Sequence, residues 1–80
     1  MEPDSARAHY YLAVTLEALE ENDEAEKSYK KVIELDGSYV AAHANLAGLY
    51  GKMNKREEAI EAFKTALQLN PNHSMARKGL

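Results

Sequence analysis

Histidines are the side chains of this sequence best suited to metal binding or proton transfer, and there are three: His9, His43 and His73. His9 and His43 are 34 residues apart, and the positions four residues after them, where a helix would present a second ligand, hold Ala13 and Ala47. If they lie on neighbouring helices, roughly 8–10 Å separates the axes, whereas Zn–N bonds are about 2.0–2.1 Å long. We expect no metal and no cofactor, and interpret both histidines as polar substitutes at the edge of a core.

Other groups that serve in catalysis also lack a productive arrangement. The four serines lie in no nucleophile motif, and there is no glycine-rich phosphate loop. Adjacent acids such as Glu57 and Glu58 fall on an expected helix surface, with no pocket implied. The chain has no cysteine, so it has neither a disulfide nor a thiolate. The sequence therefore predicts a protein that is not an enzyme.

Length and charge narrow the classes of function that remain. Eighty residues correspond to one small domain, and a net charge of −3 disfavours nucleic acid as the partner. Lys52, Lys55 and Arg56 form a small basic cluster that the following glutamates interrupt. The longest uncharged stretch, residues 37–51, is too short to span a membrane, and no basic-then-apolar leader opens the sequence. We expect a cytoplasmic protein with no membrane partner.

An internal repeat in the sequence indicates which helices position these residues. With residues 3–36 aligned above residues 37–70, eight positions are identical without a gap, and a third copy begins at Pro71. Apolar residues within each copy follow helical spacing and never alternate with period two. We therefore expect an all-α fold of two helix–turn–helix hairpins with a C-terminal stub over residues 71–80 that caps the second hairpin. The predicted helices are 4–19, 23–36, 39–53, 56–69 and 72–80.

Short polar signals suggest where the helices begin. Asp36 and Asn70 each precede a new copy and are expected to cap the helix that follows. Asn54, with Glu57 three residues later, reads as a capping box at the start of the helix over residues 56–69. Pro3 and Pro71 suit a first helical turn.

A 34-residue helix–turn–helix unit with these residues resembles the tetratricopeptide repeat family. The matching features are a Leu followed by a small residue in the first helix, a small residue early in the second helix, an aromatic four positions later, and a closing proline. The positions expected to pack the hairpins are Leu12, Ala13, Ala25, Tyr29, Leu46, Ala47, Ala59, Phe63 and Pro71. The resemblance implies a solenoid, a short right-handed superhelix in which small residues allow the two helices of each hairpin to approach closely.

The sequence also departs from the family pattern. His9 and His43 stand where the family usually has a large apolar residue, and Glu20 and Asn54 stand where it commonly has glycine at the tight turn. Gly37 replaces the proline between the copies.

For function, the resemblance implies a protein-binding scaffold whose first helices line a concave groove. The family's groove positions fall on Arg7, Tyr10, Tyr11, Val14, Glu17, Ala41, Ala44, Asn45, Gly48, Lys52 and Met75. The two tyrosines are plausible anchors, because tyrosine offers a large contact area at low entropic cost. The small residues at Ala44 and Gly48 either admit a ligand or pack against a neighbouring helix, and the sequence leaves both readings open.

One family subtype grips the C-terminal carboxylate of chaperone tails with a clamp of cations and amides. Of the clamp positions only Asn45 matches here, because Tyr10, Val14, Met75 and Gly79 occupy the others. A carboxylate needs converging cations or amide donors, so we expect no binding of chaperone tails.

A structural role is the alternative to a groove for polypeptides. About three repeats are typically needed for a stable array, and this sequence contains two and the start of a third. Residues 1–26 hold eight acids and one base, net −7, whereas residues 27–80 hold five acids and nine bases, net +4. This polarity is compatible with end-to-end self-association or with simple solvated helix faces. The chain is then a unit of a longer or self-associating array, either excised from a larger protein or a small free-standing or engineered unit.

Overall fold

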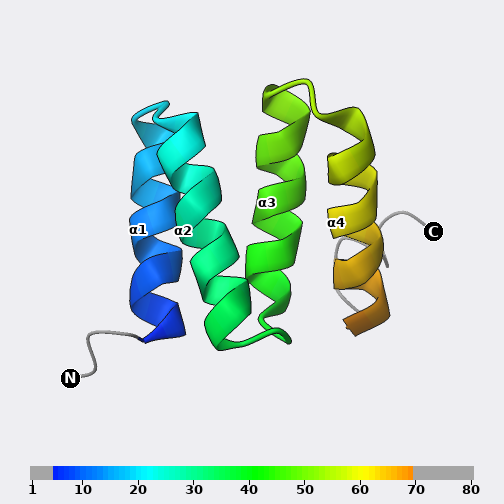
Figure 1. Cartoon of the computed structure of the whole chain (residues 1–80), viewed down its shortest axis with the longest axis horizontal. Helices are drawn as coiled ribbons and strands as arrows, with labels where there is room; N and C mark the ends of the chain where they lie inside the picture. The colour runs from blue at the N-terminus through cyan, green and yellow to red at the C-terminus, as the bar shows by residue number, and fades with distance from the viewer. Residues whose placement is uncertain (1–4, 70–80) are drawn as a thin grey trace.

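The structure, a computed structural model, describes residues 5–69 of the chain. These residues form four helices and no strands, which confirms the predicted all-α fold. Figure 1 shows the helices side by side in chain order, with the first and last at opposite ends. Their bounds are α1 Ala6–Ala18, α2 Asn22–Leu35, α3 Val40–Lys52 and α4 Arg56–Leu69. The first four predicted helices agree to within two residues, and the fifth, with Pro71 and Met75, lies outside the described residues.

Two hairpins build the fold. α1 packs along α2, α3 packs along α4, and a contact between α2 and α3 joins the hairpins (Figure 1). At the start of the second helices lie Asp23 and Glu24 in α2, and Glu57 and Glu58 in α4, where negative charge is favoured by the helix dipole. Each hairpin is thus the same unit, displaced by 34 residues.

The core lies between α1, α2 and α3. Ala13 and Ala25 are fully buried, as expected of small residues where two helices cross, and Tyr29, Leu49 and Val32 are the largest fully buried side chains. The core therefore belongs mainly to the first hairpin and to the side of α3 that covers it.

Two positions expected in the packing are more exposed than predicted. Leu12 is 48% exposed and Phe63 is 37% exposed. Phe63 lines an apolar hollow together with Ala44 and Gly48 of α3. Within residues 5–69, α1 and α4 are the first and last helices, so each has its main helix contact on one side alone.

The tight turns inside the two hairpins have the same geometry. Glu20 and Asn54, which are 34 residues apart, both have a φ of 62°, in the left-handed region that favours glycine. The amide of the following residue closes each turn, Glu21 N to Leu16 O and Lys55 N to Tyr50 O, both at 2.8 Å. These are the positions where the tetratricopeptide family commonly has glycine. The backbone keeps the left-handed conformation there although neither residue is glycine.

Two of the predicted capping signals, at Asn54 and Asp36, are wrong, and those at Pro3, Asn70 and Pro71 lie outside the described residues. Asn54 is not an N-cap, because its left-handed φ places it in the turn and α4 begins two residues later. Asp36 does not cap α3, whose N-cap is Tyr39. Instead Oδ1 of Asp36 accepts hydrogen bonds from the amide and the hydroxyl of Ser38, at 3.1 and 2.8 Å. The Asp36 side chain thus stabilises a turn rather than a helix start, and Asn54 occupies a turn position.

Candidate partner-binding groove

A chain of polar contacts joins α1, α2 and α3 along the facing sides of the two first helices. Nδ2 of Asn45, on α3, donates to the hydroxyl of Tyr10 on α1 at 2.9 Å and to that of Tyr29 on α2 at 3.4 Å. The Tyr29 hydroxyl donates to Oε1 of Glu17 at 2.8 Å, and Nζ of Lys52 lies 2.9 Å from Oε2 of Glu17. We call these five residues the groove network.

Four of the five residues of the groove network were expected groove positions, and the structure brings them together. Tyr29 is the fifth, and the sequence assigned it only a packing role. Its ring is fully buried, and burial, together with the hydrogen bond to Glu17, raises the pKa of its hydroxyl. The hydroxyl therefore stays protonated and acts as a donor at any physiological pH. The apolar pattern of the sequence did not reveal that its hydroxyl lies next to Glu17 of α1 and Asn45 of α3.

Aromatic rings gather beside the groove network, towards the start of α1. The rings of Tyr10 and Tyr39 stack at 5.2 Å between centroids, and those of Tyr10 and Tyr11 meet edge-on at 5.7 Å. The guanidinium of Arg7 lies 5.8 Å from the centroid of Tyr11, a cation–π distance. Burial, and then the neighbouring Tyr10, raise the pKa of Tyr39. Sequence reasoning missed Tyr39, because it precedes α3 and the corresponding position in the first repeat is Ser5.

The remaining expected groove residues do not all lie beside this network. Val14 is exposed on α1, and Ala41 is half-buried. Ala44 and Gly48 line a different, mainly apolar hollow of about 400 Å³ on the side of α3 that adjoins α4. We call this surface the α4 end face; it is lined by Ala44, Ala47, Gly48, Arg56, Ala59, Ile60, Phe63 and Lys64.

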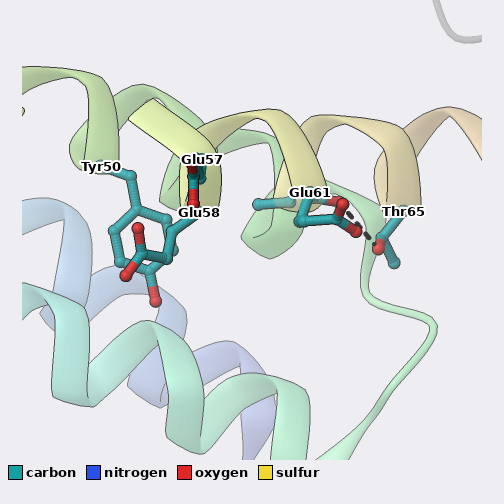
Figure 2. A pocket seen from close by; sticks show the side chains of 6 residues that line it. Tyr50, Glu57, Glu58, Glu61 and Thr65 are labelled. Carbon is teal, nitrogen blue, oxygen red and sulfur yellow. Dashed lines mark hydrogen bonds between the residues drawn. The ribbon is translucent and has the colours of Figure 1, made fainter. Parts of the chain in front are cut away.

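A second, acidic hollow of about 510 Å³ lies along α4. Figure 2 shows Tyr50 at one end of this hollow and Thr65 at the other, with Glu61 between them. The Thr65 hydroxyl donates to the main-chain oxygen of Glu61 at 3.0 Å, a contact within the helix. Its acidic side chains are those of Glu57, Glu58 and Glu61, on one helix surface.

The contact between α2 and the turn before α4 is an ionic cluster. Lys55 and Lys30 place their Nζ atoms 3.2 and 3.0 Å from the two carboxylate oxygens of Glu26, and the Tyr50 hydroxyl donates to the same carboxylate at 3.2 Å. Burial disfavours the charged form of Glu26, but the hydrogen bonds from the two lysines outweigh it and lower its pKa. The cluster thereby ties the second hairpin to the first.

His43 has a structural contact, and His73 lies outside the described residues. Nε2 of His43 lies 3.0 Å from the main-chain oxygen of Gly37, so this side chain braces the connection between the hairpins. Among residues 5–69, no group of three or more histidine, aspartate and glutamate side chains is placed to hold a metal ion. Over the same residues, no helix has the length and apolar character needed to cross a membrane.

Comparison with known protein families agrees with two helical hairpins in tandem. The family model of the tetratricopeptide repeat matches residues 6–39 and 40–73. Two consecutive matches over most of the sequence show that the chain belongs to the tetratricopeptide repeat family. The matched units have the predicted period and begin three residues later than the 3–36 and 37–70 boundaries derived above.

Solved structures of similar fold add detail. The chain is similar to a crystal structure of MamA, with 27% identity, a TM-score of 0.89, and coverage of 94% of this chain and 44% of that one. A second crystal structure, of MamA protein, is also 27% identical, with a TM-score of 0.87 and coverage of 91% and 40%. The chain therefore spans less than half the length of these structures. Family and fold together define a helical repeat module for protein–protein interaction.

Proposed function

We propose that this chain is a non-enzymatic binding module that holds an extended polypeptide segment along the facing sides of α1 and α3. The groove network carries this proposal, because it fixes polar groups from three helices along one surface. A fixed set of donors and acceptors reduces the entropy lost on binding. Such a surface suits a main chain, whose amides and carbonyls recur at regular intervals.

The chemistry of the groove specifies the kind of polypeptide. Asn45 uses Nδ2 for two tyrosine hydroxyls, and within residues 5–69 no donor reaches its Oδ1, which is then the acceptor for a peptide N–H. Tyr11 is 55% exposed and offers an aromatic face. Arg7 stands beside that face and supplies a positive charge. We therefore infer a segment with an apolar or proline side chain next to an acidic one.

The same groove argues against recognition of a free C-terminal carboxylate. Of the two cations near it, Lys52 is paired with Glu17 and Arg7 lies over Tyr11. Bidentate capture of a carboxylate needs converging, unpaired donors. The proposal is thus for an internal segment of a partner rather than for a chaperone tail.

A peptide selection tests the groove. A random peptide library displayed on phage is selected on the immobilised 80-residue chain, and the enriched peptides are measured by calorimetry against two variants of exposed groove residues, Arg7→Ala and Tyr11→Ala. We expect each variant to weaken binding at least about tenfold, as truncation of an anchor does. Lys27→Ala, an exposed change on α2, is the matched control. The proposal fails if no peptide is enriched, or if the groove variants bind as tightly as the control.

A second function, assembly of arrays through the ends of the module, is favoured by a separate observation: the apolar residues left open on α1 and on the α4 end face.

A further inference from the structure

The two repeats allow an internal comparison of covered and uncovered positions. Tyr29 and Phe63 hold the same position, yet Tyr29 is fully buried and Phe63 is 37% exposed. Leu46 and Leu12 also correspond, and their exposed fractions are 4% and 48%. The difference arises because α3 packs against α2 as well as against α4, whereas within residues 5–69 the main contact of α4 is with α3 alone and that of α1 is with α2 alone. α1 thus presents the side that α3 uses for docking, and α4 presents the side on which α2 receives it.

From this correspondence we infer that α1 of a second copy of this chain docks on the α4 end face, and that this contact repeats the one α3 makes with the first hairpin. The second copy is thereby placed as the next hairpin of the array would be, one repeat further along. The contact uses none of the five residues of the groove network, although it shares the exposed Tyr11 with the surface proposed for the polypeptide. It goes beyond that proposal because the partner is a second copy of the chain.

Side-chain sizes at the contact are complementary. In the first hairpin Tyr10 fills the space beside Tyr29, and Asn45 of α3 reaches both rings. In the second hairpin Ala44 replaces Tyr10, which helps leave the hollow of about 400 Å³ next to Phe63. The residue of the incoming α1 that corresponds to Asn45 is Tyr11, 55% exposed in the single chain. A larger side chain thus enters where the receiving surface has a smaller one, as close packing requires.

Gly48 supports the same reading of the hollow. It corresponds to Val14 in the first hairpin, and a Cβ built on it meets nothing within 4 Å. The small residues Ala44 and Gly48 therefore leave open space on the α4 end face instead of making a close helix crossing within the chain.

Charges at the proposed contact are also complementary, but the acid and the bases change sides relative to the contact inside the chain. Inside the chain, Lys55 meets Glu26, which Lys30 flanks one turn further along α2. One repeat later these positions hold different residues. Lys55 corresponds to Glu21 on the incoming copy, Glu26 corresponds to Ile60, and Lys30 corresponds to Lys64. An acid on the incoming turn therefore arrives beside bases on α4, because Arg56 and Lys64 lie one turn on either side of Ile60.

The contact uses two different surfaces of the same molecule. Each copy uses one face and keeps the other, so the pair still has one free face of each kind, and the association is heterologous and continues instead of closing as a dimer. The opposite net charges of residues 1–26 and 27–80 favour this head-to-tail order over a contact between two identical ends.

Variants that block one face at a time test the contact. Leu12→Glu disables the α1 face and Ile60→Glu, at a residue 49% exposed, disables the α4 end face. Both sites are open to solvent, so the folded chain tolerates the charge, which circular dichroism verifies. By sedimentation velocity up to millimolar concentration, the wild-type chain should form species that grow with concentration, and each variant alone should stay a monomer. An equimolar mixture of the two variants should form a pair and stop there, because only one intact face of each kind remains.

A charge exchange provides the matched control. Glu21→Lys alone should weaken the self-association of the wild-type chain, Lys64→Glu alone should do the same, and the double variant should recover part of the loss. The inference is overturned if the wild-type chain remains a monomer throughout, which is the result if residues 70–80 of the same chain occupy the α4 end face. It is also overturned if the mixed variants do not pair, or if either variant alone still associates.

Discussion

The hydroxyl of the fully buried Tyr29 donates a 2.8 Å hydrogen bond to the carboxylate of Glu17, one helix away. Glu17 is held on its other oxygen by Lys52 of the second hairpin. The pair therefore links the packing of the first hairpin to the surface proposed for binding. A change in either residue should affect both stability and the shape of the groove.

Removing the Tyr29 hydroxyl should destabilise the fold without disturbing its shape. Tyr29→Phe leaves Oε1 of Glu17 and Nδ2 of Asn45 each without one partner, which should lower the free energy of unfolding by about 1–2 kcal/mol in urea denaturation. The reciprocal change, Phe63→Tyr at the matching exposed position, should leave it nearly unchanged. Equal effects of the two changes would contradict the role given to this hydrogen bond.

The left-handed turn at Glu20 predicts a stabilising substitution. Glycine adopts a φ of 62° without the steric cost that a Cβ imposes there, so Glu20→Gly should raise the free energy of unfolding by about 0.5–1 kcal/mol. Lys27→Gly, at an exposed position inside α2, should lower it instead, because glycine is unfavourable in a helix interior. Thermal denaturation of the two variants against the wild type distinguishes them, and a loss of stability in Glu20→Gly would refute the argument.

The crossing of α1 and α2 should not accept a large side chain. Ala25 is fully buried, and Ala25→Phe should destabilise the domain by about 1–3 kcal/mol or more, as overpacking does. Ala18→Phe, at an exposed position of α1, is the control and should have little effect. An unchanged thermal midpoint in Ala25→Phe would mean that the helices are placed wrongly.

The Glu26 cluster predicts a dependence of stability on pH. The pKa of Glu26 is lowered from its ordinary value of 4.5, so the unfolded chain binds the proton at a higher pH than the folded chain does. Its contribution is complete above 4.5 and is lost as the pH falls through the lower, folded pKa. Wild type should therefore exceed Glu26→Gln in urea stability at neutral pH, and the gap should close in acid.

The exposed Glu34 supplies the control for that titration. Glu34→Gln removes an acid whose side chain is 72% exposed, and its difference from wild type should be small at every pH. A gap between wild type and Glu26→Gln that stays constant in acid would contradict the ionic account of the cluster.

The repeat and its helices were predictable because both rest on periodic patterns. Ala13 and Ala25 fell in the core as expected, and each described helix was placed within two residues of its observed bounds. Periodicity specifies which side of a helix is apolar, but not whether another element covers that side. For that reason Leu12 and Phe63 were expected to be packed, but they are 48% and 37% exposed.

The groove network was predictable only in part. Asn45, Tyr10, Glu17 and Lys52 came from the positions that the family uses, and they do lie together. The roles of Tyr29 and Tyr39 depend on where side chains from three helices meet, which spacing along one helix does not reveal. Asn54 was misread because its side chain suits an N-cap and a left-handed turn equally well.

The measurement that bears most directly on the binding function is a nitrogen-15 NMR titration of the wild-type chain with a peptide from the library selection. The side-chain amide of Asn45 gives its own pair of signals, separate from the backbone. The account predicts that these signals and the backbone amides of α1 and α3 shift together on binding. Shifts confined to α2 and α4, with the Asn45 side-chain signals unmoved, would contradict it.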